Sequence, residues 1–248
     1  VIRKIELLFA SRSKAIITVS DSISEHLKRT FSTESVVVIR NIPSYTHSGK
    51  HNLFREILPI DETTPILLYQ GLISKSRGAD IILSAIVNLP VNLNFKFILM
   101  GSGDYKEQAQ CLVKSMCLDE KVYILDPVEQ AELLKYTARA DIGIHAIDDS
   151  CLNHEYCLPN KLFEYINAGI PVIFPDLKDI KKLVDKYGVG STFERNNSQD
   201  LANSIECILK DENLIEKYKA NVNSSKQELS WDKEEFKLLS LYREVLGG

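Results

Sequence analysis

Asn153 to Phe174 read NHEYCLPNKLFEYINAGIPVIF, and this stretch organises the rest of the chain. The pattern predicts a polar loop, a short helix over Asn160 to Ala168, and a buried strand over Ile170 to Phe174. Pro159 suits the first turn of a helix, and Gly169 suits the position just past its end. The stretch therefore predicts a helix that starts directly from a polar loop and leads into a buried strand.

The start of this helix has the features of an anion-binding site. The side chain of Leu158 cannot cap the first backbone N–H groups, which would then point outward with the positive end of the helix dipole. Lys161 and Glu164 share one face of the helix just inside that start. A cation and a carboxylate beside free amides could hold a phosphate and a hydroxylated sugar. An ordinary amphipathic helix with a solvated polar face is the alternative.

The composition excludes several classes of protein. Of the 248 residues, 44% are hydrophobic and 26% are charged, and the formal net charge of -4 argues against a nucleic-acid partner. The longest apolar runs are far too short to span a bilayer. The five cysteines follow neither disulfide nor zinc spacing, which favours reduced thiols in a cytoplasmic protein. The first residues are amphipathic, unlike a signal peptide, and the absence of an initial Met leads us to expect that the natural chain starts further upstream.

From Pro65 onward, short apolar runs alternate with amphipathic helical patterns. The predicted strands are Ile66 to Gln70, Phe95 to Met100, Val122 to Leu125, Ile142 to His145 and Ile170 to Phe174. The predicted helices lie near residues 79–88, 105–116, 129–138 and 160–168. This alternation predicts an α/β fold, with a Rossmann-like parallel sheet covered by helices on both faces and ligands bound beyond the carboxyl ends of the strands.

The segments outside this alternation are less regular. Two strands, at residues 15–19 and 36–39, and two helices precede it, and Ser20 is a good cap for the second helix. Polar residues up to Lys50 suggest a linker. The last stretch predicts a helix whose apolar side should dock on the protein. That side consists of Phe236, Leu239, Tyr242 and Leu246, widened by Leu238, Leu241 and Val245.

Small or polar residues follow the predicted strands and are candidate ligand-binding residues. Gly71 would let the backbone approach a ligand closely, and Arg77 could reach a phosphate with its planar guanidinium. Gly101 opens a weak Gly-x-Gly signal, and the bend ending at Val128 could meet a flat base. His145 would face the helix start, either as a ligand or as a structural histidine. No metal site is expected, because the spacing of the histidines and nearby acids is irregular.

Several short segments occur in a recognisable order. They are AIITVS (15–20), VIRN (38–41), YQG (69–71) with RG (77–78), MGSG (100–103), ADIGIH (140–145), LPNKLFEY (158–165), AGIPVI (168–173) and SWD (230–232). In this order they resemble the C-terminal half of a GT-B fold, retaining glycosyltransferase of family four, also called glycosyl transferases group 1. The resemblance covers almost the whole chain.

The resemblance implies roles for particular residues. Glu164 matches the second Glu of the family's signature and would accept hydrogen bonds from the nucleotide ribose. The amides near Leu158 to Lys161, a stretch that includes Pro159 and Asn160, would hold the donor diphosphate. Of the two cations that the family supplies to the diphosphate, the first is replaced by Leu72, while Arg77 can serve as the second. Lys161 could supply the missing charge.

The position of the first signature Glu departs from the family pattern. Counting back from Glu164 puts Tyr156 in its place, with Glu155 one residue early. In the family this Glu holds hydroxyls of the transferred sugar. Either a loop shift lets Glu155 substitute, or the sugar is bound differently. The segment resembles a subgroup carrying PNKLFEY in which this change is tolerated.

The resemblance also implies a division of the chain. Residues 1–42 would be the remnant end of an N-terminal acceptor domain, and residues 43–64 a linker and first helix. Residues 65–225 would be the nucleotide-sugar-binding Rossmann-like domain, and residues 226–248 a helix that crosses back toward the missing domain.

The implied activity is transfer of a hexosyl or other glycosyl group, with retention, from a UDP- or GDP-linked nucleotide sugar to a saccharide or lipid-linked acceptor, as in polysaccharide biosynthesis. No metal or other cofactor is expected. This chain would supply the donor-binding half, and the missing part could attach peripherally to the inner face of the membrane. The alternative is a non-catalytic nucleotide-sugar-binding subunit that needs a separate acceptor-binding chain.

Overall fold

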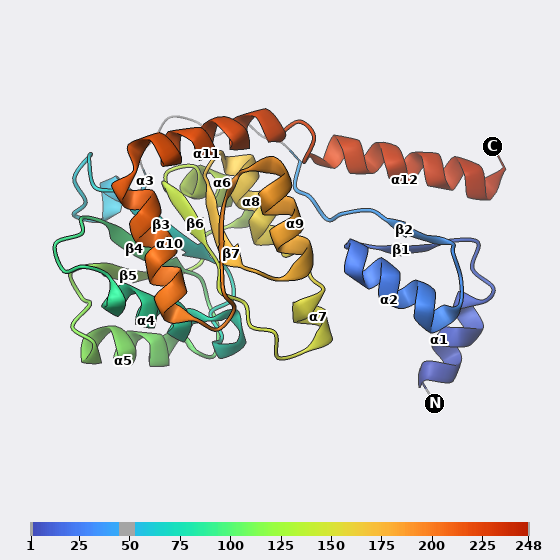
Figure 1. Cartoon of the computed structure of the whole chain (residues 1–248), viewed down its shortest axis with the longest axis horizontal. Coiled ribbons are helices and arrows are strands. Elements are labelled where there is room, and N and C mark those ends of the chain that lie inside the picture. The colour runs from blue at the N-terminus through green and yellow to red at the C-terminus, as the bar shows by residue number, and fades with distance from the viewer. Residues whose placement is uncertain (1, 45–52, 248) are drawn as a thin grey trace.

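The computed structural model describes residues 2–44 and 53–247, which form two parallel sheets (Figure 1). The smaller sheet pairs β1 (Ile16–Thr18) with β2 (Val36–Val38). The larger has six strands in the order β5-β4-β3-β6-β7-β8. These strands are β3 (Ile66–Gln70), β4 (Lys96–Met100), β5 (Val122–Leu125), β6 (Ile142–Ile144), β7 (Val172–Pro175) and β8 (Gly190–Phe193).

The six-stranded sheet is parallel throughout, and its central strands are buried on both faces. All five side chains of β3 are buried, which explains its continuous apolar sequence. Gln70 lies opposite Met100, and Met100 lies opposite Leu125, so the carboxyl ends of β3, β4 and β5 meet at one edge. The strand order reverses between β3 and β6, where a ligand crevice is expected in such a sheet.

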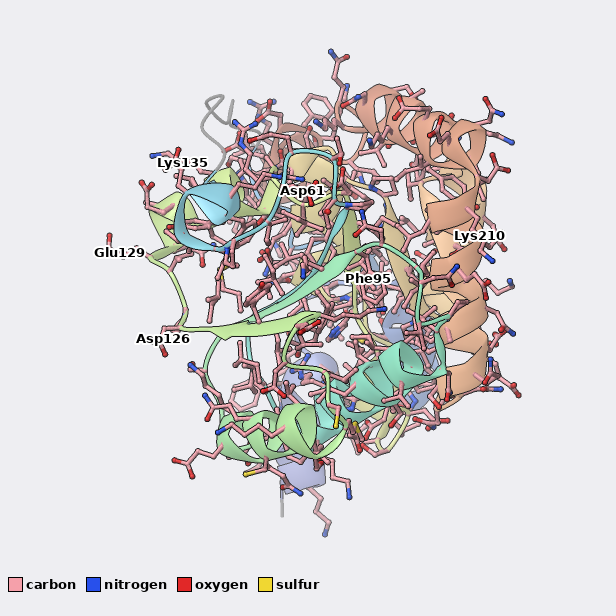
Figure 2. The ribbon with its side chains drawn as sticks, turned by 90° about the vertical axis from the view of Figure 1, so that its left-hand side faces the viewer. Asp61, Phe95, Asp126, Glu129, Lys135 and Lys210 are labelled. Carbon is pink, nitrogen blue, oxygen red and sulfur yellow. The ribbon has the colours of Figure 1, made fainter. Side chains whose placement is uncertain are left out.

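Helices cover both faces of this sheet, and the fold predicted from the sequence is confirmed. One face packs against α4 (Ala79–Asn88), α5 (Lys106–Ser115) and α10 (Ser198–Lys210). The other packs against α3 (Leu53–Ile57), α6 (Gln130–Thr137), α8 (Asn160–Ala168) and α9 (Lys178–Tyr187), while α11 (Glu212–Ser225) contacts α8, α9 and α10. In Figure 2, Phe95 points into the interior, whereas Asp126 and Glu129 lie at the periphery where β5 leads toward α6.

Some boundaries differ from the predictions. The predicted strand from Ile170 begins two residues later, at Val172, and the predicted polar loop contains a short helix, α7 (Leu152–Glu155). Neither α9 nor β8 was predicted from the sequence. Part of the predicted linker, residues 45–50, lies outside the described residues. Asn167 Nδ2 donates to the carbonyls of Pro43 and Ser44 at 3.3 and 3.0 Å, which ties the start of that segment to α8.

The N-terminal elements α1 (Ile2–Ala10), α2 (Asp21–Phe31), β1 and β2 lie beside the larger sheet, next to α12 (Trp231–Leu246) (Figure 1). Ser20 caps α2 as predicted, since its Oγ accepts from Ile23 N at 3.2 Å. Ser22 donates from its N and Oγ to the buried carboxylate of Asp179 at 2.8 and 3.0 Å. These contacts fix α2 against α9. None of the helices in the described residues is long and apolar enough to cross a membrane.

The docking face predicted for α12 is wrong. Its four main residues are exposed: Phe236, Leu239, Tyr242 and Leu246. The half-buried side instead carries Leu238, Leu241 and Val245, in line with Glu234, which is 1% exposed. Glu234 Oε2 accepts from Arg40 N at 2.9 Å, so the buried side of the helix is the one that carries this hydrogen bond rather than the more apolar one.

Candidate functional site

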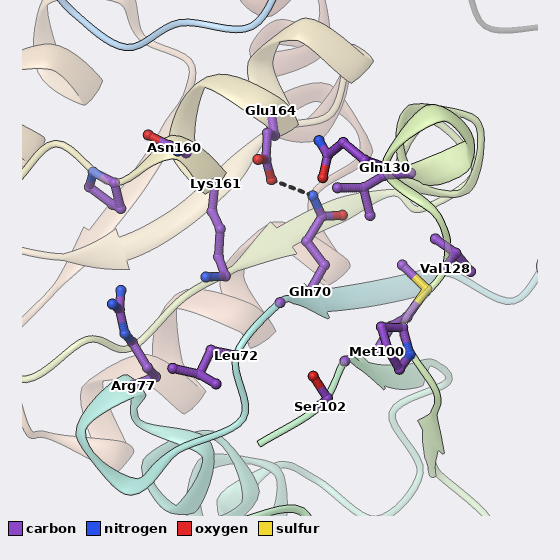
Figure 3. A pocket seen from close by; sticks show the side chains of 15 residues that line it. Gln70, Leu72, Arg77, Met100, Ser102, Val128, Gln130, Asn160, Lys161 and Glu164 are labelled. Carbon is purple, nitrogen blue, oxygen red and sulfur yellow. Dashed lines mark hydrogen bonds between the residues drawn. The ribbon is translucent and has the colours of Figure 1, made fainter. Parts of the chain in front are cut away.

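A cavity of about 540 Å³ opens at the carboxyl ends of β3 and β4, below the start of α8 (Figure 3). Eight of the candidate residues from the sequence line it: Gly71, Arg77, Gly101, Val128, Pro159, Asn160, Lys161 and Glu164. Further lining residues that the sequence analysis did not assign are Gln70, Leu72, Met100, Ser102, Pro127, Gln130 and Leu133. The structure therefore brings together residues from five separate segments of the chain.

The start of α8 forms one wall and offers backbone donors. Pro159 is the residue before the first helical turn, with extended φ and ψ, and no side chain caps the helix. The side chain of Asn160 is turned to Asn41, whose Nδ2 donates to Asn160 Oδ1 at 3.2 Å. Uncapped amides at a helix start, together with the helix dipole, favour a bound anion.

Two cations, Arg77 and Lys161, point into the cavity (Figure 3). Arg77 ends the 3-10 turn η1 (Lys75–Arg77), and Lys161 lies in the first turn of α8. Neither forms an ion pair with a carboxylate within the described part of the chain; Lys161 Nζ lies instead 5.6 Å from the ring centre of Tyr69. Burial, followed by the charge of Arg77, lowers the pKa of Lys161 to about 8. A largely buried cation without an anionic partner is costly, and a bound anion would remove that cost.

Gly71 makes room for Lys161. Its φ of +107° lies in the region that favours glycine. A Cβ at this position would stand 2.8 Å from Lys161 Cε and 2.9 Å from Nζ. A side chain here would therefore displace the cation from the cavity.

Glu164 supplies the carboxylate of the cavity. Its Oε2 accepts from Gln70 Nε2 at 2.7 Å (Figure 3). Gln70 in turn accepts at Oε1 from Thr137 Oγ1, also at 2.7 Å. Gln70 belongs to the site, although no role was predicted for it from the sequence. The available signal was a polar residue at the end of an otherwise apolar strand.

His145 does not line the cavity. It is fully buried, with its ring 5.5 Å from the rings of both Tyr69 and Phe174. Neither ring nitrogen has a hydrogen-bond partner in the described residues. Burial, and then the charges of Lys161 and Arg77, hold the pKa of His145 well below its usual range, so the ring is neutral. Its predicted contact with the donor stays a prediction.

Leu158, Glu155 and Tyr156 also lie outside the cavity lining. Leu158 is buried, and its predicted contribution came through its backbone. Tyr156 faces the N-terminal elements, because its carbonyl accepts from Ser20 Oγ at 2.6 Å and its ring centre lies 6.0 Å from that of His26. Roles for Glu155 and Tyr156 toward a sugar remain predictions.

No cluster of three or more His, Cys, Asp or Glu side chains suited to a metal ion occurs in residues 2–44 and 53–247. His154 forms a pair with Asp148, with 2.7 Å between Nδ1 and Oδ1. These two residues are among the histidines and nearby acids whose irregular spacing is described above.

Comparisons with known proteins agree with this architecture. An uncharacterized glycosyltransferase, MJ1607, of Methanocaldococcus jannaschii is 23% identical over 272 aligned residues, covering 99% of this chain and 65% of that protein. Among solved structures, sucrose-phosphate synthase from Thermosynechococcus elongatus has a TM-score of 0.83 at 18% identity, covering 99% of this chain and 61% of that one. Anabaena HepE in complex with UDP has a TM-score of 0.84 at 18% identity, covering 98% of this chain and 67% of that one.

The chain thus spans less than two thirds of the length of the Methanocaldococcus and Thermosynechococcus proteins. The family model for glycosyl transferases group 1 matches residues 51–225, which include β3 to β8 and every residue that lines the cavity. The chain therefore belongs to the glycosyl transferases group 1 family.

Proposed function

We propose that this chain is the donor-binding half of a retaining glycosyltransferase that transfers a sugar from a UDP-linked donor. The observation that carries the proposal is the set of unpaired charges in one cavity. Lys161 and Arg77 lack a carboxylate partner among the described residues and stand beside the uncapped start of α8. Such a site suits a diphosphate, because phosphate oxygens accept from both amides and cations.

The remaining walls suit the rest of a nucleotide. Glu164 would accept from the ribose hydroxyls through its Oε1, for which no hydrogen bond occurs within the described part of the chain. Gly101 and the bend from Pro127 to Val128 would hold the base. Anabaena HepE, a structural neighbour, has been solved with UDP and with UDP-glucose, which supports uridine as the nucleoside.

Catalysis would rest on stabilising the leaving diphosphate. When the bond between the sugar and the phosphate breaks, negative charge grows on the departing oxygen. Lys161, Arg77 and the amides at the start of α8 would stabilise that charge from the cavity wall, and this would lower the barrier without large reorganisation. The acceptor, a saccharide or a lipid-linked saccharide, would bind to a further domain or partner chain.

The test is calorimetric titration of the chain with UDP, GDP and ADP. We expect UDP to bind most tightly, and Lys161→Met to weaken UDP binding at least tenfold, which corresponds to about 1.4 kcal/mol. Lys114→Met is the matched control, because Lys114 is an exposed lysine of α5 outside the cavity. The proposal fails if none of the three nucleotides binds, or if both variants bind UDP as the wild type does.

A further inference from the structure

Gln70 is a buried polar side chain at the end of an apolar strand. It is 1% exposed, and the four residues before it in β3 are apolar or aromatic and fully buried. An apolar side chain would fill such a position at lower cost, because burying an amide requires that its hydrogen bonds be replaced. Its partners therefore indicate why a glutamine stands here.

The amide of Gln70 has one possible orientation. The carboxylate of Glu164 only accepts hydrogen bonds, so Nε2 must face Glu164 Oε2, at 2.7 Å. Oε1 then faces Thr137 Oγ1, also at 2.7 Å, and the hydroxyl must donate to it. Thr137 is fully buried in α6, and its hydroxyl also lies 2.7 Å from the Leu133 carbonyl, so its single proton is shared between that carbonyl and Gln70 Oε1.

The backbone of Gln70 holds the neighbouring residue of α8. Gln70 N donates to the hydroxyl of Tyr165 at 3.2 Å, and that hydroxyl donates to the Leu68 carbonyl, also at 3.2 Å. Tyr165 is fully buried. Two consecutive residues of α8, Glu164 and Tyr165, thus depend on the end of β3 for their position.

From these contacts we propose that Gln70, held by Thr137, is a positioning residue that occupies one oxygen of Glu164 and presents the other to the ribose of the donor. The inference rests on the proposed function and adds specificity to it. With Oε2 bound to Gln70, Glu164 Oε1 is left for a diol in the cavity. Without the amide, the carboxylate would rotate and would lose the fixed direction in which it accepts.

The test compares two ligands that differ only at the ribose, UDP and 2′,3′-dideoxy-UDP, by calorimetric titration of the full chain. The wild type should prefer UDP. Gln70→Leu should weaken UDP binding about tenfold, or about 1.4 kcal/mol, and leave the affinity for the dideoxy analogue unchanged. A merely structural role would weaken both ligands alike.

Thr137 provides a second pair of variants should Gln70→Leu fail to fold. Thr137→Val removes the hydroxyl at nearly constant shape and should reduce the preference for UDP, whereas Thr137→Ser keeps the hydroxyl and should keep the preference. Equal losses for both ligands, or an unchanged preference in Gln70→Leu and Thr137→Val, would overturn the positioning role alone. If the wild type binds neither ligand, the proposed donor fails and this inference fails with it.

Discussion

Replacing Lys161 with Met should stabilise the free protein while it weakens nucleotide binding. Burial and the charge of Arg77 lower the pKa of Lys161 from 10.5 to about 8. At about 1.4 kcal/mol per pH unit, this fall corresponds to about 3 kcal/mol by which the charged side chain disfavours folding at pH 7. Met keeps most of the aliphatic stem and removes the charge. We therefore expect a gain of about 1 to 3 kcal/mol in the free energy of unfolding.

The sign of the pH dependence follows from the lowered pKa. Between about pH 8 and 10.5 the unfolded chain holds the proton at Lys161 more tightly than the folded chain does. The wild type therefore gains stability as the pH rises through that window, and the difference from Lys161→Met shrinks. Below pH 8 the variant keeps its full advantage over the wild type in the free energy of unfolding. At pH 9.5 about half of it should remain.

Urea unfolding at pH 7.0 and 9.5, followed by circular dichroism, measures both quantities. Lys114→Met is again the control, since an exposed substitution should change stability by less than about 0.5 kcal/mol at either pH. Added UDP should stabilise the wild type by mass action, and at the same concentration should stabilise Lys161→Met less. A variant less stable than the wild type at pH 7.0, or a difference that does not shrink at pH 9.5, would refute the account of Lys161 as an unpaired buried cation.

Three further predictions concern the cavity and α12. UDP affinity of the wild type should fall above pH 8, by at most about tenfold per pH unit, as Lys161 loses its proton, and calorimetry between pH 7 and 9 should show no such fall in Lys161→Met. Gly71→Ala should destabilise the protein by about 1 to 2 kcal/mol in thermal unfolding, because of its positive φ, and should weaken UDP binding by displacing Lys161. Glu234→Leu should cost about 1 to 3 kcal/mol in urea unfolding, because the N–H of Arg40 loses its partner, whereas Glu235→Leu, at the next and exposed position, should cost little.

The sequence predicted the elements whose signals are local. The bounds of β3, β5, α4 and α8 match the predicted ranges, since each is an apolar or amphipathic run that ends at Gly, Pro or a polar turn. In contrast, β8 was not predicted, because its residues, Gly-Ser-Thr-Phe, lack a strand pattern and it pairs only with β7 at the edge of the sheet. For α9, the apolar positions Ile180, Leu183 and Val184 were an available signal among many lysines, although no helix was predicted there.

The candidate site likewise has one part that could be predicted from the sequence and one part that could not. Parallel strands must end at one edge, so the sequence alone could bring Gly71, Gly101 and the start of α8 together. Strand order and residue type could not say which side chain after a strand turns inward. His145 is buried between two aromatic rings, and Gln70 faces Glu164, because α8 and β7 pack where they do. Those contacts depend on tertiary packing rather than on local pattern.

The segment just before α8 shows how the N-terminal elements bear on the site. Ser20 Oγ donates to the Tyr156 carbonyl, and Asn41 donates to the side chain of Asn160, so the N-terminal segment contacts the chain on either side of Pro159. In this arrangement Glu155 does not line the cavity. For Glu155 to reach a sugar on the donor, the loop would have to move, and the contact between Ser20 and Tyr156 would have to break or shift. Sugar binding by Glu155 would therefore be coupled to the position of α2, which begins directly after Ser20.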